Sequence, residues 1–324
     1  MPFHHGKPAF ADPKTGLAFK KIFGQPSGKS SLIGLLNALL RLPDEARIID
    51  LEYLTPEQLP AHEGLKLSIL DVKCLDVTGA RYVVEMQVFQ VEGFEKRVVY
   101  NACKAYVEQL GEGASYSQLN DVIAVTICNF KLWPDTVDML SRWRMREDRS
   151  GETGLQQVQY VFLELPKYPA GQRPRTHEEK WAWFFRETLH LREVPEDLRE
   201  LPFATALEAA RRVNFNDWEW TEYEREKMAE EAFYGGLRFA WKEGYKAGFA
   251  EGLAEGLAEG LADDTEEGFA EGIANGLRLA IADRCELLGL PLGPAEHAHL
   301  ARLNAQDLEA LRLQIKASRR WPEA

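Results

Sequence analysis

The chain has 324 residues, which is long enough for one sizeable domain with appendages or for two domains. No apolar run approaches the ~20 residues of a membrane-spanning helix, and residues 1–10 lack the apolar stretch of a signal peptide, so we expect a cytoplasmic protein with no membrane span. The net charge of −12 does not exclude a nucleic-acid partner. Residues 217–278 hold 16 acidic and 6 basic residues, whereas the rest of the chain holds 35 and 33.

The first half of the chain alternates between helical and strand patterns. Apolar residues at helical spacing predict helices at residues 15–41, broken by a loop at 24–30, and at residues 95–111. Further apolar stretches predict strands at residues 47–54, 65–75, 81–91, 121–130 and 158–165. This order of elements predicts an α/β fold with a mixed-sheet core over residues 10–190.

From residue 177 onward the pattern is helical throughout, so the core should be followed by an all-helical C-terminal region. We divide this region into a helical extension at 191–240, a repeat at 241–282 and a C-terminal helical segment at 283–324. The repeat has a four-residue period led by glycine and then an aromatic or aliphatic residue. Since glycine costs ~1 kcal/mol relative to alanine inside a helix, we expect either a long helix packed on a second copy of the chain or a frayed, solvated helix.

Two acidic residues face each other in the hairpin predicted from the strands at 65–75 and 81–91. Pairing centred on Thr78 gives partners whose numbers sum to 156, which places Asp71 opposite Glu85. Gly79 can supply the left-handed backbone that such a short hairpin loop needs. Gln87 shares a face with Glu85, because side chains alternate along a strand.

Facing carboxylates destabilise a sheet unless something compensates their charge, and Mg²⁺ takes hard oxygen ligands of this kind. The neighbours Leu70, Val72 and Val83 are apolar, which favours an enclosed pair over a solvated edge. The same spacing fits an exposed hairpin with an incidental acid pair, and the spacing alone does not separate the two interpretations.

Several ordered blocks of the chain carry a family resemblance. Asp, a hairpin turn and then Glu-x-Gln is similar to the PD-(D/E)XK nuclease motif. More narrowly, the chain resembles the bacterial recombination-promoting nuclease/putative transposase family, over roughly residues 12–189. The blocks that carry this resemblance are DPKTGLAFKKIFG (12–24), LSILDVK (67–73), YVVEMQ (82–87), residues 100–130, FLELPKY (162–168) and WAWFF (181–185).

The resemblance implies a restriction-endonuclease-like core in which Asp71 and Glu85 hold Mg²⁺ or Mn²⁺. The broader superfamily usually has lysine where this chain has Gln87, whereas the narrower family generally resembles this sequence in having glutamine. An amide cannot act as a base, but it can orient a water by hydrogen bonds. The resemblance therefore implies metal-assisted hydrolysis with Gln87 positioning the water, and it leaves the proton acceptor unassigned.

Weaker candidates accompany this site. Lys20 and Lys21 in the opening block could contact phosphates or could form a solvated helix face. The resemblance implies that Tyr100 and Gln109, on the helix after the motif, support the site, although at least one tyrosine of that helix should simply belong to the core. A loop with four arginines at 142–149 could touch DNA or face solvent. The four cysteines lack the ligand spacing of a zinc site.

Taken together, the residues and the resemblance predict a Mg²⁺-dependent DNA endonuclease that is associated with recombination or mobile elements and forms a homo-oligomer through its tail. The alternative is a non-catalytic oligomeric interaction protein on a degenerate nuclease fold. The retention of Gln87 beside Asp71 and Glu85 favours the enzyme.

Overall fold

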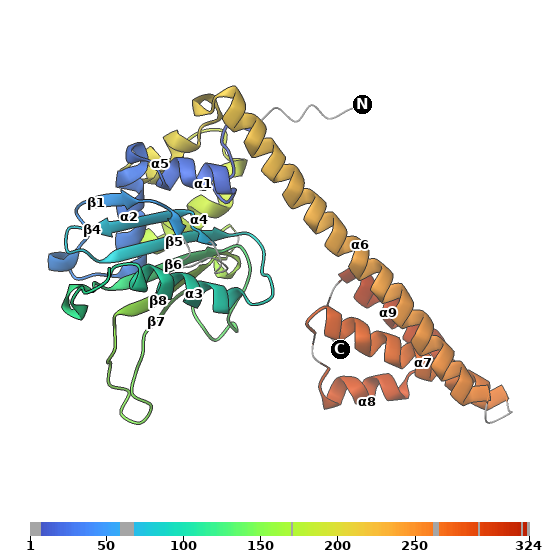
Figure 1. The fold of residues 1–324 in the computed structure, drawn as a ribbon. Coiled ribbons are helices and arrows are strands. Elements are labelled where there is room, and N and C mark those ends of the chain that lie inside the picture. The colour runs from blue at the N-terminus through green and yellow to red at the C-terminus, as the bar shows by residue number, and fades with distance from the viewer. Residues whose placement is uncertain are drawn as a thin grey trace. The chain divides into compact units, whose positions relative to one another are not determined.

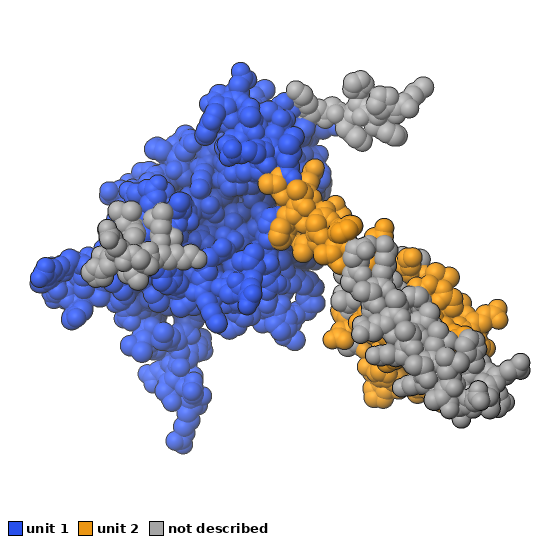
Figure 2. Space-filling view, turned by 45° about the vertical axis from the view of Figure 1, so that its right-hand side comes forward, with its two compact units in different colours: residues 1–228 blue, residues 229–324 orange. Residues whose placement is uncertain are grey.

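The computed structural model describes residues 8–58, 68–169, 171–261, 266–290, 292–318 and 320–322. The chain forms two compact units, residues 1–228 and residues 229–324, which are coloured separately in Figure 2. The first unit contains the sheet, and in its described residues the second is helical (Figure 1). Among the described residues, no helix is both long enough and apolar enough to cross a membrane.

A six-stranded mixed sheet forms the centre of the first unit. Its strand order is β1 (Leu51–Leu54), β4 (Val72–Asp76), β5 (Arg81–Gln87), β6 (Val122–Cys128), β8 (Val158–Glu164) and β7 (Leu140–Trp143). Strands β5, β6 and β8 are parallel, and the other neighbouring pairs are antiparallel. Every residue of β6 is buried, as its apolar sequence VIAVTIC predicts for a strand covered on both faces. The predicted α/β fold with a mixed sheet is confirmed.

Helices cover both faces of the sheet (Figure 1). Helix α3 (Phe94–Val107) packs through Val98, Ala102 and Ala105 on one face. The larger core lies on the other face, where it is built from α1 (Gly16–Phe23), α2 (Lys29–Leu40), α4 (His177–Glu187) and α5 (Phe203–Ala210). Because side chains alternate along β5, Val84 and Met86 point into this larger core, whereas Val83, Glu85 and Gln87 lie on the side of α3.

An aromatic cluster fixes α1 against the rest of the larger core. The ring of Phe23 lies 5.7 Å from that of Trp181 and 5.8 Å from that of Phe185, between ring centroids. Both Phe23 and Trp181 are completely buried. Such packing holds the axis of α1 in place, so that its polar face has a defined position next to the sheet.

The strand predicted at 65–75 is interrupted in the structure. A two-residue strand β3 (Ser68–Ile69) pairs with β2 (Glu57–Gln58) in a separate small sheet, and β4 starts only at Val72. The Leu70 N–H donates to the Pro56 carbonyl, which takes the chain off the main ladder directly before Asp71. The first part of the predicted strand, residues 65–67, lies outside the described residues. The four-residue edge strand β7 was not predicted.

Short 3₁₀ helices connect the larger elements. They are η1 (Pro26–Gly28), η2 (Asp44–Ala46), η3 (Tyr116–Gln118), η4 (Leu165–Lys167), η5 (Thr188–His190), η6 (Glu196–Leu198) and η7 (Arg212–Asn214).

The first unit continues well past residue 190, where the sequence suggested that the core domain ends. Phe203, Leu207 and Phe215 belong to the same hydrophobic core as the sheet. The long helix α6 (Asp217–Leu261) then begins within this unit, where the buried Tyr223 hydroxyl accepts a hydrogen bond from the Asp12 backbone N–H at 2.9 Å. The predicted helical extension therefore contributes its first part to the nuclease-like core.

The second unit comprises the rest of α6 with α7 (Glu266–Leu287), α8 (Pro294–Arg302) and α9 (Ala305–Ser318). Leu277, Ile281, Leu308 and Ile315 form its small core. The repeat is helical wherever the structure describes it, and residues 262–265 between α6 and α7 lie outside the description. The side chains at 243–270 are also outside it, and they include the apolar residues expected to pack on a second copy of the chain, which are Phe249, Leu253, Leu257, Leu261 and Phe269.

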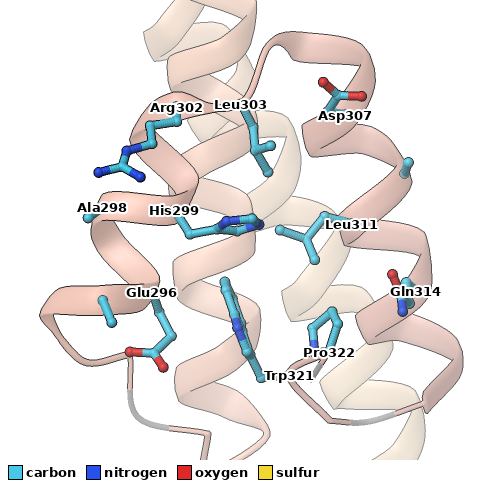
Figure 3. A pocket seen from close by; sticks show the side chains of 12 residues that line it. Glu296, Ala298, His299, Arg302, Leu303, Asp307, Leu311, Gln314, Trp321 and Pro322 are labelled. Carbon is cyan, nitrogen blue, oxygen red and sulfur yellow. The ribbon is translucent and has the colours of Figure 1, made fainter. Parts of the chain in front are cut away.

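A pocket of about 710 Å³ opens between α8 and α9 in the second unit. Figure 3 shows the His299 ring within it, above the ring of Trp321, with Leu311 opposite. The His299 and Trp321 rings meet edge to face, with 6.1 Å between centroids. The pocket contains none of the predicted site residues.

Candidate active site

The register of the β4–β5 hairpin agrees with the predicted one. Val72 pairs with Val84 and Lys73 pairs with Val83, so that paired numbers sum to 156 and Asp71 falls opposite Glu85. Asp71 itself lies just before β4, and its side chain takes the place of a backbone partner: Asp71 Oδ2 accepts the Met86 N–H at 2.9 Å. Because the predicted strand is interrupted before β4, the Asp71 carboxylate can accept a hydrogen bond from the β5 backbone and lie beside Glu85.

Each carboxylate has one oxygen tightly held and one oxygen with only long contacts among the described residues. Asn101 Nδ2 donates to Glu85 Oε1 at 2.9 Å, in the same way that Met86 N–H holds Asp71 Oδ2. The second oxygen of Asp71, Oδ1, is 3.8 Å from Lys20 Nζ. The second oxygen of Glu85, Oε2, is 3.4 Å from Gln87 Nε2. Each of the two oriented carboxylates therefore has one oxygen that is available to a ligand.

Burial makes ionisation of this pair less favourable than that of carboxylates in water. Burial raises the pKa of Asp71, although the hydrogen bond from Met86 and the charges of Lys20 and Arg97 oppose the rise. Burial is also the largest cause that raises the pKa of Glu85, and the neighbouring charge of Asp71 adds to it. A bound cation would remove this mutual repulsion.

The donor set fits a small divalent cation. Carboxylate oxygens are the ligands that Mg²⁺ prefers, and Mg²⁺ commonly binds through one or two of them while it keeps water and substrate phosphate oxygens. Within the described ranges, no group of three or more His, Cys, Asp or Glu side chains is arranged to hold a metal. Asp71 and Glu85 would hold such an ion as a pair, with water and substrate completing its coordination.

The structure separates the two lysines of α1. Lys20 lies near the carboxylates, 3.8 Å from Asp71 Oδ1, and its side chain is 48% exposed. Lys21 instead forms an ion pair with Glu219 at the start of α6, with 2.6 Å between Nζ and Oε1. Consecutive helical residues point about 100° apart, so the helix can present only one of the two to the site.

Two further residues, Gln109 and Tyr100, were expected to support the site. The Gln109 amide donates to the Asn120 carbonyl at 2.9 Å and accepts from the Asn120 N–H at 3.0 Å. This contact lies next to the start of β5, whereas Glu85 lies near the end of that strand. Tyr100 is 42% exposed, and the Lys104 ammonium lies 5.8 Å from its ring centroid. Gln109 is therefore engaged away from Asp71, Glu85 and Gln87.

Sequence reasoning missed two residues that contact the site, Arg97 and Asn101. Asn101 is buried and donates to Glu85, and Arg97 Nη2 donates to Gln87 Oε1 at 2.5 Å. They are four residues apart, and therefore neighbours on one face of α3. The sequence did contain a signal for them. Val98 and Ala102 form an apolar stripe that must face the sheet, and Arg97 and Asn101 are the polar residues next to that stripe.

The arginine-rich loop lies at the other end of the sheet. Its first arginine, Arg142, lies within β7 and not in a loop. The rest of the loop connects β7 to β8 and precedes Val158, which pairs with Val122 at the start of β6. Glu85 and Gln87 lie at the end of β5, which is parallel to β6. Residues 144–157 thus lie at the amino ends of the parallel strands, whereas the carboxylates lie toward their carboxyl ends.

Of three comparisons with known proteins, one identifies a family. No curated protein and no solved structure matches the chain. A family model described as PD-(D/E)XK nuclease family transposase matches residues 13–232, which is more than half of the chain and includes Asp71, Glu85, Gln87 and the start of α6. Such a family implies a phosphodiester hydrolase that acts on DNA and is linked to mobile elements, and nucleases of this type typically use divalent metals. The chain belongs to the PD-(D/E)XK nuclease family transposases.

Proposed function

We propose that this protein is a Mg²⁺-dependent DNA endonuclease that acts in the cytoplasm in recombination or in the movement of mobile elements. The observation that carries the proposal is the paired arrangement of Asp71 and Glu85. Glu85 is buried and Asp71 is half-buried. Each carboxylate is oriented by one close hydrogen bond and keeps a second oxygen with only long contacts among the described residues. By contrast, both oxygens of the fully buried acid Glu164 accept close hydrogen bonds.

Four side chains divide the work of binding and orientation. Asp71 and Glu85 would hold Mg²⁺ or Mn²⁺, which when bound supplies Lewis-acid activation of the scissile phosphate and of water. Lys20, partly exposed at the rim, would contact a DNA phosphate. Gln87 would orient the attacking water by donating a hydrogen bond through Nε2.

Cleavage of a supercoiled plasmid tests this function. We expect nicked or linear product with Mg²⁺, no product with EDTA, and no product from Glu85→Ala. The matched control is Glu52→Ala, which removes an exposed acid from the edge strand β1 and should cleave like the wild-type protein. Binding of DNA without cleavage under any divalent cation would instead favour a non-catalytic interaction protein.

We also propose that the second unit assembles copies of the chain. The many glycines of the repeat oppose an isolated helix, so a partner helix is needed to stabilise it. A truncation that tests this role has to keep the part of α6 that packs on the first unit. Removal of residues 229–324 leaves the contacts of Tyr223 and Lys227 with Asp12 intact, whereas a truncation after Thr221 would delete them. Truncation after Met228 should therefore lower the oligomeric state in light scattering and retain metal-dependent cleavage. An unchanged oligomeric state would contradict the assembly role.

A further inference from the structure

Gln87 occupies the position at which the broader superfamily usually has lysine, and its amide is already engaged at both ends. Arg97 Nη2 donates to Gln87 Oε1 at 2.5 Å. Gln87 Nε2 lies 3.4 Å from Glu85 Oε2, on the side of the carboxylate pair. The amide therefore bridges a guanidinium on α3 and a carboxylate on β5.

The partner at each end determines which way the amide points. A guanidinium can only donate hydrogen bonds, and an ionised carboxylate can only accept them. The Gln87 oxygen must therefore face Arg97, and its NH₂ group must face Glu85. If the amide were reversed, its NH₂ would meet the Arg97 donors and its oxygen would meet the Glu85 carboxylate, so both contacts would be repulsive.

Arg97 is held where it can perform this task. It lies one helical turn before Asn101, the residue that orients Glu85, and its guanidinium lies 5.6 Å from the centroid of the buried Phe94 ring. Its Nε is buried with no hydrogen-bond partner in the part of the chain that the structure describes. A cation with an unsatisfied buried donor contributes little to stability, so its position is better explained by a role at the site.

We propose that Arg97 is a positioning residue that fixes the amide of Gln87 with its NH₂ group toward the carboxylates. In this arrangement, Arg97 supplies the positive charge and Gln87 the hydrogen-bond donor that a single lysine would supply. The inference rests on the proposed nuclease function. It also means that Gln87 presents its NH₂ group to the attacking water as a donor, because its oxygen faces Arg97.

A double-mutant cycle of Arg97→Met and Gln87→Lys tests the proposal by plasmid cleavage with Mg²⁺. Arg97→Met should lower kcat by about 10- to 100-fold, as is usual when a group that orients a catalytic ligand is lost. Gln87→Lys alone should also be impaired, because its ammonium would lie against the guanidinium. The double variant should be more active than either single variant, since lysine needs no arginine to orient it. Equal losses from Arg97→Met in both backgrounds would overturn the proposal.

Two controls separate this role from a loss of charge or of folding. Lys96→Met removes one positive charge from the exposed neighbouring position on α3 and should leave kcat unchanged. Arg97→Lys retains a charged donor and should recover part of the activity lost in Arg97→Met. Circular dichroism identifies any variant that fails to fold.

A second measurement does not depend on cleavage and so keeps this inference distinct from the proposed function. The side-chain NH₂ resonances of Gln87, assigned by their disappearance in Gln87→Lys, report the environment of the amide. They should shift and lose protection from hydrogen exchange in Arg97→Met, and remain unchanged in Lys96→Met. Unchanged Gln87 resonances in Arg97→Met would overturn the proposal even for an active nuclease. A wild-type protein without cleavage but with these shifts would overturn the nuclease function and leave the positioning contact established.

Discussion

Each end of the β4–β5 hairpin has an aspartate, the buried Asp76 at the turn and the half-buried Asp71 at the open end. The fold supplies the two carboxylates with very different numbers of hydrogen bonds. At the turn end, Asp76 Oδ1 accepts from the Thr78 N–H, the Thr78 hydroxyl and the Ala80 N–H, and its Oδ2 accepts from the Tyr82 hydroxyl at 2.8 Å. At the open end, Asp71 accepts one close hydrogen bond, from Met86. The same residue type therefore stabilises the turn at one end of the hairpin and remains available for a ligand at the other.

This comparison shows how a structural acid is distinguished from a candidate catalytic one. Asp76 is buried and Asp71 is half-buried, so the two differ in burial only by degree. The clearer difference is the number of hydrogen bonds that the fold itself supplies. Glu164 supports the same rule, since this fully buried carboxylate accepts from the Leu132 and Trp133 backbone N–H groups and pairs with Lys167 at 2.9 Å.

The largest expected effect comes from removing the charge at the open end. Asp71→Asn should lower plasmid cleavage by at least about 10³-fold, because a neutral amide cannot replace the carboxylate charge that holds a divalent cation. Urea unfolding of the metal-free protein should show no loss of stability, since the repulsion between Asp71 and Glu85 is also removed. Cleavage by this variant at the wild-type rate would remove Asp71 from the site.

The opposite outcome is expected at the turn end. Asp76→Ala should lower the free energy of unfolding by about 3 kcal/mol, because it leaves the buried Tyr82 hydroxyl and the turn N–H groups without their acceptor. The fraction that remains folded should cleave plasmid at a nearly normal rate. A variant that is fully stable and inactive would show that the two ends of the hairpin are not functionally separate.

A smaller effect at the turn end tests the same separation without changing a charge. Gly79 has φ of +88°, and an added Cβ would lie 3.0 Å from the Asn120 side chain. Gly79→Ala should therefore destabilise the protein by about 1–2 kcal/mol, measured by urea unfolding, and leave cleavage intact. A change in metal affinity, measured by calorimetry with Mn²⁺, would show that strain in the turn reaches the carboxylates.

The smallest effect is a pH-dependent difference in melting temperature between Glu85→Gln and the wild-type protein without divalent cations. The pKa of Glu85 is raised in the folded state, so the wild-type protein loses stability relative to the variant as pH rises from the ordinary carboxyl pKa through the raised one. The advantage of Glu85→Gln should be small at pH 4 and larger at pH 8. A difference that is constant over this range would contradict the raised pKa.

Local sequence patterns were enough to predict the sheet and the facing acids. Apolar runs located β5, β6 and β8, and the position of Gly79 fixed the register that aligns Asp71 with Glu85. The interruption before Asp71 was not predictable, because it depends on a hydrogen bond from Leu70 to Pro56, a contact between separate parts of the chain. The edge strand β7 was missed because four residues with only one fully buried side chain give no clear periodicity.

The supporting residues show the same limit. Lys20 and Lys21 are indistinguishable in the sequence, and only the packing of α1 and the nearby Glu219 decide which one lies beside Asp71. Gln109 was selected because it follows the motif helix, but its amide is used to hold the Asn120 backbone. The role of Arg97 could not be predicted from apolar spacing alone, because it comes from the contact of α3 with β5. The polar residues next to the apolar stripe of α3 have to be considered as well.

The attachment of α6 to the first unit has a consequence for how this gene can change. Glu226 accepts the Leu17 N–H at the start of α1, and Lys227 pairs with Asp12. Both contacts precede the four-residue repeat, and the family match ends at residue 232. Replication slippage could add or delete whole repeat units, each about 6 Å of helix, without displacing a contact of α1 or the lysine beside Asp71. If the second unit assembles copies of the chain and the first unit cleaves DNA, as proposed, repeat number could vary under selection for assembly alone, while the order and spacing of residues 12–227 would remain under selection for the chemistry.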